Sequence, residues 1–389
     1  MKEKIYDAVI IGAGPAGASL AYFLSEFNFK IALVERKKHA DTPVRCAEFV
    51  PKAFTMLYNE KIKGINNEIS HMDTYIDGRL ANVIVSKGYI LDRNLFVDFL
   101  IKEFVKRGGE YLNSSSFTDI SYADKDKNPI EISRAGKNSE SQNFDKAPLL
   151  YVKIRQRDEN LCLKTKILAG ADGPCSLVGR SMHSFHQNNN SYLAGFQENI
   201  IKKYPDKDHI KIFFYPFIPG GYGWLFPKTN SLNIGAAVNA RSLKENSLKS
   251  IYSRFKDELV KNKFITGDEI IKSSISGLVP VYGIRRRTAI NNIVLVGDAA
   301  GLCNPITGAG NYNAVLSAKI TSEKIKNALQ MYSIGALKES EIETNSYFKA
   351  SIDHALKKRK ILEKNNENYG FEELIKKTWV SFKEYWRER

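Results

Sequence analysis

The first 35 residues carry the feature that most limits how this chain can fold. The apolar, β-branched stretch YDAVIIG (residues 6–12) has the character of a buried parallel strand, and it runs directly into the turn Gly12-Ala-Gly14-Pro-Ala-Gly17. A stretch with helical spacing, ASLAYFLSEF (18–27), follows, and a second predicted strand, KIALVE, ends at Glu35. This order of strand, glycine turn, helix and strand predicts a parallel α/β unit that binds a dinucleotide.

The three glycines of this turn have separate physical tasks. Gly12 permits the tight turn, Gly14 lets the backbone approach a pyrophosphate, and Gly17 lets the helix lie close to the sheet. The first turn of the helix, around Ala16, offers free N–H groups and the positive end of the helix dipole to phosphates. A glycine loop alone is weak evidence, but its position between a strand and a helix makes a dinucleotide site the expected interpretation.

The end of the second strand narrows the choice of dinucleotide. Glu35 lies 18 residues after Gly17, near the spacing of an acid that binds a ribose hydroxyl. A carboxylate there repels a 2′-phosphate, so FAD or NAD fits better than NADP. The neighbouring Arg36 weakens that distinction.

A second constellation, nearly three hundred residues later, indicates FAD. IVLVG (293–297) is another predicted buried strand that leads to Asp298, and a Gly- and Pro-rich turn then reaches a helix that begins near Gly308. We expect Asp298 to accept hydrogen bonds from ribityl hydroxyls, and the backbone N–H groups around Gly310 and Asn311 to face the flavin N1–C2=O edge. The alternative is that this is a second, unrelated turn between a strand and a helix. That alternative leaves unexplained why the chain carries both the glycine turn at residues 12–17 and the Asp298 turn.

A third motif lies between these two and completes a resemblance. ILAGADGPCSLVGR (167–180), together with GAGPAG and LVGDAAGLCNPITGAG, resembles in order the motifs of the p-hydroxybenzoate hydroxylase superfamily, over residues 5 to about 320. The resemblance implies an α/β fold with α+β elements: a Rossmann-like FAD-binding domain, an inserted antiparallel β-sheet substrate domain and a helical C-terminal region. We assign these to residues 1–180 with 285–330, to 181–284 and to 331–389, and expect residues 45–90 to contribute to the substrate side.

Two further stretches resemble the geranylgeranyl reductase family within that superfamily. VRCAEFVP (44–51) is similar to the family's Cys-containing loop, and YGWLFP (222–227) matches its YxWxFP motif. A GxG follows that motif in the family; here Gly235 is present and Ala237 replaces the second glycine, which narrows the predicted cavity by one methyl group. Related halogenases carry WxWxIP instead, which this stretch does not match.

The resemblance also implies further contacts to FAD. We expect Cys46, Ala47 and Phe49 to lie against the flavin, and Arg93 to support FAD from a helix within residues 89–109. The alternative for Arg93 is a surface residue paired with Asp92.

The resemblance to this family implies that the protein is a reductase, which uses reduced FAD to saturate C=C bonds of an isoprenoid chain. That chain would be part of a membrane lipid, a diphosphate or a quinone. An isolated alkene is not polarised, so a proton must arrive with, or before, the hydride from flavin N5, and aromatic faces suit a cation-like transition state. The stretch FFYPFIPGGYGWLFP (213–227) supplies such faces. The expected substrate contacts are Tyr215, Tyr222, Trp224, Phe226 and Pro227.

The catalytic candidates are Cys46, Tyr215, Tyr222 and Trp224. The proton donor stays open among the cysteine, the two tyrosines and an ordered water. Cys46 and Cys303 both fall near the predicted flavin edge, and we hypothesise either a redox-sensitive disulfide between them or two small buried apolar side chains.

Charge and motifs limit the partners. The formal net charge of +15 favours an anionic partner, but no nucleic-acid-binding motif is present, so nucleic acid is excluded. Without a second nucleotide-binding motif, the electron donor is expected to be transiently bound NADPH or reduced ferredoxin, an acidic protein suited to this charge.

Two alternative functions remain open at this point. One is an FAD-dependent aromatic monooxygenase or halogenase, and the other is a non-catalytic flavin-binding electron carrier.

Cysteine usage and apolar stretches set expectations about location. The four cysteines form no CxxC pair or metal-type spacing with the six histidines, which predicts a reducing cytoplasm and no metal site. Residues 6–24 are mostly apolar, but Pro15 and three glycines argue against a signal peptide or membrane helix. The tail FEELIKKTWVSFKEYWRER (371–389) has apolar residues at helical spacing with two tryptophans among Lys and Arg. It predicts either a helix in peripheral contact with anionic membrane or one packed on its own domain or a dimer partner.

Overall fold

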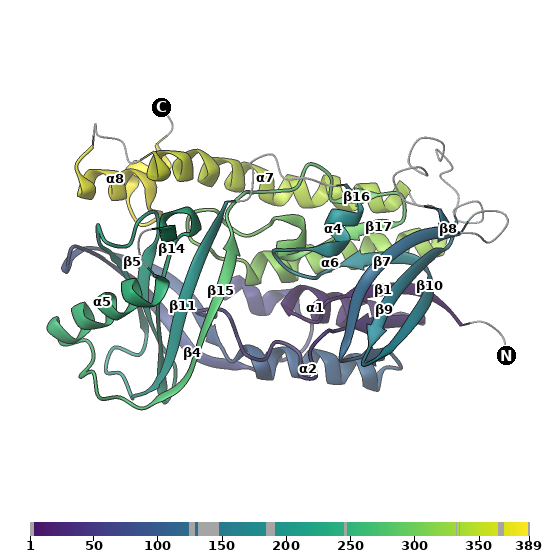
Figure 1. The fold of residues 1–389 in the computed structure, drawn as a ribbon, viewed down its shortest axis with the longest axis horizontal. Coiled ribbons are helices and arrows are strands. Elements are labelled where there is room, and N and C mark those ends of the chain that lie inside the picture. The colour runs from purple at the N-terminus through teal and green to yellow at the C-terminus, as the bar shows by residue number, and fades with distance from the viewer. Residues whose placement is uncertain are drawn as a thin grey trace.

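The computed structural model describes residues 4–123, 129–130, 148–183, 191–244, 247–331, 333, 335–364 and 369–387. Two β-sheets lie side by side along the long axis of the molecule, and the helix α7 (Gly335–Glu363) runs along both (Figure 1). The sheet nearer the N-terminus is called sheet A below, and the other is called sheet B.

Sheet A is built around parallel strands that are buried on both faces. Its strands are β1 (Ile5–Ile11), β2 (Ile31–Val34), β6 (Glu110–Leu112), β7 (Ser115–Ala123), β8 (Pro129–Ile130), β9 (Leu150–Gln156), β10 (Glu159–Gly170), β16 (Ala289–Ile290) and β17 (Ile293–Leu295). β1 pairs in parallel with β2 and β10, and β10 pairs in parallel with β17. Every residue of β2 and β17 is buried, as expected for strands covered on both faces.

Three helices pack on this sheet and use the caps that the sequence provides. They are α1 (Pro15–Leu24), α2 (Arg93–Lys106) and α6 (Asn311–Met331). α1 contacts both other helices, and each of its residues after Pro15 is buried. Proline suits the first helical turn because its missing N–H has no partner there. Asp92 caps α2 by accepting the N–H of Leu95 at 3.2 Å.

Sheet B has eight strands in the order β15-β11-β14-β13-β12-β4-β5-β3. They are β3 (Phe49–Pro51), β4 (Ile65–Ile76), β5 (Arg79–Leu91), β11 (Tyr192–Ile201), β12 (His209–Phe214), β13 (Tyr222–Pro227), β14 (Ser231–Asn239) and β15 (Ile271–Pro280). All neighbours among these described strands pair antiparallel except β4 and β12, which are parallel. Residues 49–91 therefore join the same sheet as residues 192–280, while the division into domains stays a prediction.

Each face of sheet B is covered by different helices. α5 (Leu248–Lys261) covers one face, where the rings of Phe213 and Phe255 lie 5.5 Å apart. The C-terminal helices α7, α8 (Phe371–Thr378) and α9 (Lys383–Trp386) cover the other face, where the rings of Phe214 and Trp379 lie 5.0 Å apart. Because side chains alternate along a strand, the consecutive residues Phe213 and Phe214 belong to opposite cores.

The C-terminal tail packs on the chain itself, and the prediction of one continuous helix is wrong. α8 ends at Thr378, because Trp379 is extended (φ −111°) and turns its indole into sheet B. The apolar side chains that follow the helical stripe are buried there, and only Trp386 is largely exposed. Among the helices described, none is both long and apolar enough to span a bilayer.

Replacing Trp379 by alanine should destabilise the protein strongly. The side chain is 3% exposed, so its removal leaves a cavity, and the free energy of unfolding is expected to fall by about 3–5 kcal/mol. The matched control is Trp386→Ala, whose side chain is 65% exposed and whose loss should cost less than about 0.5 kcal/mol. Urea unfolding followed by fluorescence measures both, and equal losses would contradict the packing described here.

Candidate functional site

The glycine turn lies where β1 ends at the edge of sheet A. Gly12 has φ +98°, and its N–H donates to the carbonyl oxygen of Val34 at 2.8 Å. A Cβ on Gly17 would lie 1.8 Å from the Gly12 oxygen, so only glycine lets α1 pack this close. An ideal Cβ on Gly14, in contrast, meets no heavy atom within 4 Å. The space beside the N-terminus of α1 is therefore open, and it fits a diphosphate.

The Glu35 carboxylate is buried and held by two backbone groups at the end of β2. Its Oε2 accepts the N–H of Ala13 at 2.8 Å, and its Oε1 accepts the N–H of Lys37 at 2.9 Å. Each carboxylate oxygen keeps a further lone pair, so the acid can also accept a ribose hydroxyl. Arg36 is exposed, and its contact with a cofactor stays a prediction, as does that of Glu35.

Asp298 follows β17 at the same edge of sheet A. Burial raises the pKa of its carboxyl from 3.8 to about 6, against the opposing effect of the Arg93 guanidinium. An ideal Cβ on Gly310 would lie 3.0 Å from Asp298 Oδ1, so this glycine lets the start of α6 approach the carboxylate. Gly308 has φ +64°, and Asn311 is the first residue of α6. A half-buried acceptor beside a helix N-terminus fits the ribityl and flavin end of FAD.

Arg93 is buried, and the alternative of a surface residue paired with Asp92 is wrong. Its Nε donates to Asp41 Oδ2 at 2.9 Å, its Nη2 pairs with the other Asp41 oxygen, and its side chain is 11% exposed. Its backbone N–H donates to Glu48 Oε1 at 3.0 Å. Arg93 thus connects the Cys46 loop, defined as residues 44–51, to the nucleotide edge; direct support of FAD stays a prediction.

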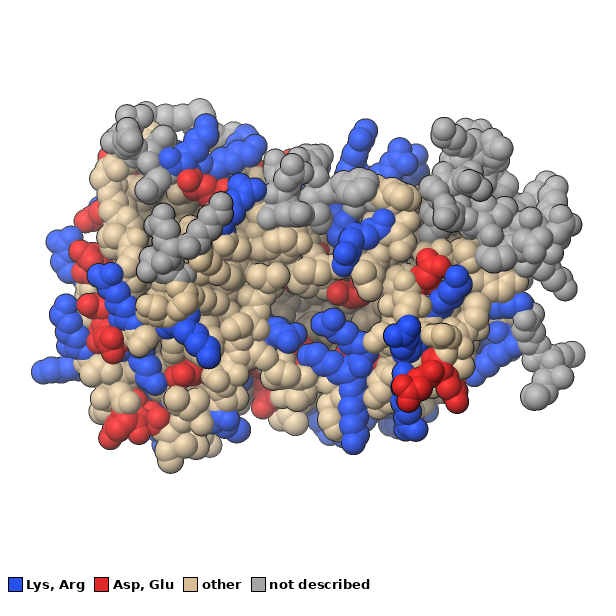
Figure 2. All heavy atoms as spheres, in the orientation of Figure 1, with Lys and Arg blue, Asp and Glu red and all other residues tan. Residues whose placement is uncertain are grey.

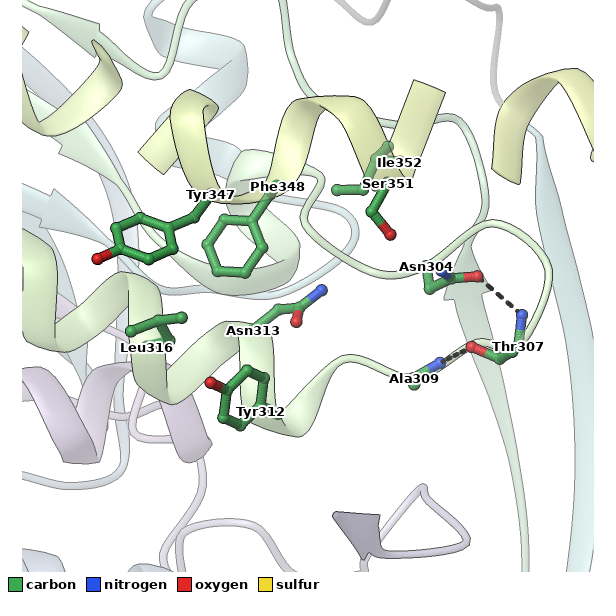
Figure 3. Close-up of a pocket in the computed structure, with 10 residues that line it drawn as sticks. All are labelled: Asn304, Thr307, Ala309, Tyr312, Asn313, Leu316, Tyr347, Phe348, Ser351 and Ile352. Atoms are coloured by element: carbon green, nitrogen blue, oxygen red, sulfur yellow. Dashed lines mark hydrogen bonds between the residues drawn. The ribbon is translucent and has the colours of Figure 1, made fainter. Parts of the chain in front are cut away.

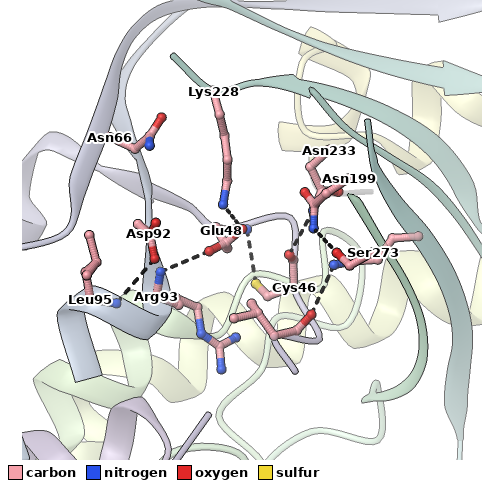
Figure 4. Close-up of polar contacts among 12 residues, drawn as sticks. Cys46, Glu48, Asn66, Asp92, Arg93, Leu95, Asn199, Lys228, Asn233 and Ser273 are labelled. Carbon is pink, nitrogen blue, oxygen red and sulfur yellow. Dashed lines mark hydrogen bonds and ion pairs between the residues drawn. The ribbon is translucent and has the colours of Figure 1, made fainter. Parts of the chain in front are cut away.

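The Cys46 loop is fixed by buried polar contacts (Figure 4). Cys46 Sγ accepts the N–H of Glu48 at 3.2 Å and Nδ2 of Asn311 at 3.4 Å. Glu48 has φ +72°, and its Oε2 pairs with Lys228 Nζ at 2.5 Å. Burial raises the pKa of Glu48, against the opposing effect of Lys228. Ala47 and Phe49 flank these residues and are half-buried.

Asn233 joins the Cys46 loop to the aromatic segment. Its Oδ1 accepts the indole N–H of Trp224 at 2.7 Å, and its Nδ2 donates to the Cys46 carbonyl oxygen at 3.3 Å. A Cβ on Gly235 would lie 2.2 Å from Trp224 Cζ2, so this glycine makes room for the indole. Asn233 and Lys228 were not predicted from the sequence; a polar asparagine within the otherwise apolar stretch SLNIGAAVN was the available signal for Asn233, which is fully buried in the structure.

The other residues of the 222–227 motif lie near the same site. Tyr222 donates its hydroxyl proton to the Thr307 carbonyl oxygen at 2.5 Å, and burial raises the pKa of this phenol. The rings of Phe226 and Phe49 lie 6.5 Å apart, and Pro227 is buried at the end of β13. The motif therefore connects the Cys46 loop with the turn before α6.

Tyr215 lies away from these residues, and the structure does not bring it together with them. It packs in the core between sheet B and α5, where its ring stacks on Phe217 at 5.0 Å. Tyr222, Trp224 and Phe226 belong to the core on the opposite face. The reason is the two-residue period of the strand, which places Tyr215 on the side of Phe213.

All four cysteines lie within the described residues, and each is a thiol rather than half of a disulfide. Cys303 is buried in the turn before α6, and burial, with the nearby Asp298 and Cys46, raises the pKa of its thiol. Cys46 and Cys303 thus lie in one region as thiols, and a redox-dependent disulfide between them stays a hypothesis.

The described surface is hollowed in more than one place. Figure 2 shows a hollow near the middle of the drawn face, with Lys and Arg side chains along its rim. A second cavity of about 390 Å³ lies between α6, α7 and the turn before α6 (Figure 3). Thr307 lines it and also bonds to Tyr222, so this cavity adjoins the aromatic segment. Its lining is neutral: Asn304, Thr307, Ala309, Tyr312, Asn313, Leu316, Tyr347, Phe348, Ser351 and Ile352.

Comparisons with known proteins agree with this arrangement. Residues 192–277 match the model of the geranylgeranyl reductase catalytic domain, and residues 10–45 match that of an NAD(P)-binding Rossmann-like domain. A digeranylgeranylglycerophospholipid reductase of Methanococcus vannielii is 27% identical over 94% of this chain and 89% of its own length. A protein of the same name from Methanocaldococcus jannaschii is 26% identical over the same shares of the two chains.

Solved structures share the fold. A geranylgeranyl bacteriochlorophyll reductase-like protein of Thermoplasma acidophilum superposes with a TM-score of 0.75 at 22% identity, over 97% of each chain. The Pseudomonas aeruginosa protein PqsL, in complex with 2-aminobenzoylacetate, superposes with a TM-score of 0.68 at 16% identity, over 92% of this chain and 97% of its own. These likenesses confirm the predicted fold class, and the Rossmann-like match supports a flavin cofactor at the edge of sheet A.

Filling the open space at Gly14 should prevent FAD binding without unfolding the protein. Gly14 has φ −72°, which any residue adopts, so Gly14→Val is expected to fold but to bind FAD at least about 100-fold more weakly, because its methyl groups occupy the space for the diphosphate. The control is Gly370→Val, which also has an ordinary φ (−62°) and open space. Flavin absorbance after desalting measures retention, and full retention by Gly14→Val would contradict this site.

The stability of the FAD-free protein should depend on pH through Asp298. Because its pKa is raised from 3.8 to about 6, the folded state binds this proton more tightly than the unfolded state, so the free energy of unfolding falls as the pH rises between these values. The contribution is roughly 3 kcal/mol. Asp298→Asn should remove it, whereas Asp257→Asn, at an exposed position, should keep it. Urea unfolding from pH 4 to 7 tests this, and identical pH profiles of wild type and Asp298→Asn would refute it.

Proposed function

Because the chain belongs to the geranylgeranyl reductase family, we propose that it saturates carbon–carbon double bonds of isoprenoid chains with FAD as the hydride source. It is an oxidoreductase of that family, and the identity of the isoprenoid substrate is part of the proposal. The observation that carries the proposal is the position of Cys46, which hydrogen bonds link both to Asn311 at the nucleotide edge and, through Asn233, to Trp224.

Reduced FAD would supply a hydride to the alkene, and the protein must provide the rest. An unpolarised alkene accepts hydride only if a proton also arrives, and the cation-like transition state is stabilised by aromatic faces and destabilised by water. Trp224 and Phe226 supply such faces on a buried side of sheet B. Their exclusion of water strengthens every electrostatic interaction at the reacting carbons.

We assign the proton to Cys46 Sγ. Two N–H donors, the Glu48 backbone and Asn311 Nδ2, point at this sulfur and would stabilise the thiolate that remains after proton transfer. Tyr222 is the weaker candidate, because its proton is bonded to the Thr307 carbonyl oxygen and burial raises its pKa. Tyr215 lies on the other face of sheet B and is left out of the mechanism.

The isoprenoid chain is expected to be part of a glycerophospholipid. The curated relatives named above are digeranylgeranylglycerophospholipid reductases, and that name supports a membrane lipid over a free diphosphate or a quinone. Burial of apolar surface contributes about 0.8 kcal/mol per CH₂ group, so the chain can bind without polar contacts along most of its length. An anionic headgroup also suits the net charge of +15.

The electrons for FAD are expected to come from NADPH or from reduced ferredoxin. The positive charge of the protein supports an acidic electron-transfer protein, since complementary charges accelerate encounter. Anaerobic mixing of the oxidised holoprotein with each donor distinguishes them, because only a true donor bleaches the flavin absorbance at a catalytically useful rate.

Variants of the site should reduce lipid turnover and keep the cofactor. Cys46→Ala is expected to lower the rate of alkene reduction by about 100-fold or more, because the proton donor is lost, while Cys162→Ala, at an exposed position, should have no effect. Trp224→Ala should also lower the rate, because the wall admits water. The assay is anaerobic reduction of the holoprotein, incubation with geranylgeranyl glycerophospholipid, and mass spectrometry of the product.

Two outcomes would contradict this function, and a third would contradict the role of the aromatic segment. Unchanged alkenes with every lipid offered would exclude the reaction, and product formation that requires oxygen would indicate a monooxygenase instead. Release of FAD by Trp224→Ala would assign the aromatic segment a structural role.

A further inference from the structure

Two histidines face each other across the one parallel junction of the strands described in sheet B. His209 and His71 form the first residue pair of the parallel β12–β4 ladder, so their side chains lie on the same face. Their imidazole rings are stacked, with centroids 4.8 Å apart and an angle of 23° between the planes. The two strands come from parts of the chain 138 residues apart.

A carboxylate completes this group. The ligand atoms of His71, His209 and Asp208 all lie within 4.8 Å of one another. Around tetrahedral zinc, ligand atoms are about 3.3 Å apart, since each lies about 2.0 Å from the metal. Asp208 is exposed and both histidines are half-buried, so small side-chain rotations close that difference.

The hydrogen bonds around the group leave a metal-binding nitrogen on each imidazole. Asp73 is buried and accepts from His209 Nδ1 at 2.8 Å, which makes Nδ1 the protonated nitrogen and leaves the Nε2 lone pair available. The Ser70 hydroxyl lies 2.6 Å from Asp208 Oδ2 and 2.7 Å from His71 Nδ1. Its single proton goes to the carboxylate, so it accepts from His71 Nδ1–H, and His71 Nε2 is likewise left available.

The surrounding charges favour a cation. Asp73, Asp206 and Asp208 contribute three carboxylates, and Lys211 is the ammonium group that contacts the first two, at 2.8 and 3.3 Å. The one ammonium group of Lys211 neutralises only part of the charge of these three carboxylates. A divalent cation between Asp208 and the histidines would therefore bind where the net charge of these four groups is negative. A carboxylate behind a metal-binding histidine is also the usual arrangement that orients the ring.

We propose that His71, His209 and Asp208 bind one divalent transition metal ion of the zinc type, with water as a further ligand. Two imidazoles and one carboxylate suit Zn²⁺ better than Mg²⁺ or Ca²⁺, which prefer oxygen ligands alone. The ion would join β4 to β12 at the start of their ladder and so connect the two parts of sheet B. Sequence spacing predicted no metal site, because the two histidines become neighbours only through strand pairing.

The test is titration of the metal-free holoprotein with Zn²⁺ alone, by calorimetry and by thermal unfolding. Wild type and the control His39→Gln, at an exposed position, are expected to bind one ion per chain and to unfold at a higher temperature with Zn²⁺. His71→Gln and His209→Gln should bind at least about tenfold more weakly and lose the shift in unfolding temperature. Asp208→Asn, at an exposed position, serves the same purpose if a histidine variant fails to fold.

Two results would overturn the proposal. The first is the absence of Zn²⁺ binding by the wild type, and the second is equal binding by all variants. Loading with Co²⁺ adds an independent criterion, since ligation by cysteine gives a strong near-ultraviolet charge-transfer band. Ligation by the proposed nitrogen and oxygen atoms gives only weak visible bands, so a thiolate band would also assign the ion to another site.

Discussion

The crowding of backbone at the carboxyl edge of sheet A is the constraint on which the rest of the molecule depends. A Cβ on Gly12 would lie 2.4 Å from the Ala171 oxygen, and one on Gly297 would lie 2.8 Å from Ala16 Cβ. The three chain segments at this edge can therefore approach only because these positions lack side chains. Their approach places the N-termini of α1 and α6 beside the ends of β1 and β17, where Glu35 and Asp298 provide the acceptors. A long cofactor whose diphosphate lies between a ribose and a ribityl chain fits that edge.

The Cys46 loop connects this edge of sheet A to sheet B. Its last residues belong to β3, which is a strand of sheet B. Hydrogen bonds also join Cys46 Sγ to Asn311 at the start of α6, and the Cys46 carbonyl oxygen to Asn233 in sheet B. These bonds are part-buried, and loss of one partner there leaves a polar group unsatisfied at a cost of about 1–3 kcal/mol. The position of the Trp224 indole is thus coupled to the start of α6 through Asn233.

The local turns at the edge of sheet A could be predicted from consecutive residues, whereas contacts that depend on strand register could not. The turn at Gly12 to Gly17 and the Asp298 turn are local, because their geometry follows from the residues themselves. Asn233 could not be assigned to Cys46 from the sequence, since their contact requires β14 and the loop to meet in space. The pairing of His71 with His209 has the same origin. The tail was misjudged because helical spacing does not show where a helix ends.

In the segment 213–227, a local sequence pattern and the pairing of strands both determine where the side chains lie. Its aromatic residues are divided between two cores, because β12 and β13 each alternate their side chains across sheet B. In β13, Tyr222, Trp224 and Phe226 face the C-terminal helices, while Gly223 and Leu225 face α5. A Cβ on Gly223 would lie 2.4 Å from the Phe255 ring, so the position between the two aromatic residues must be small for α5 to pack. In this chain the YxWxFP pattern is therefore constrained on both faces: its aromatic positions form the wall beside the Cys46 loop, and an intervening position sets the distance to the helix behind it.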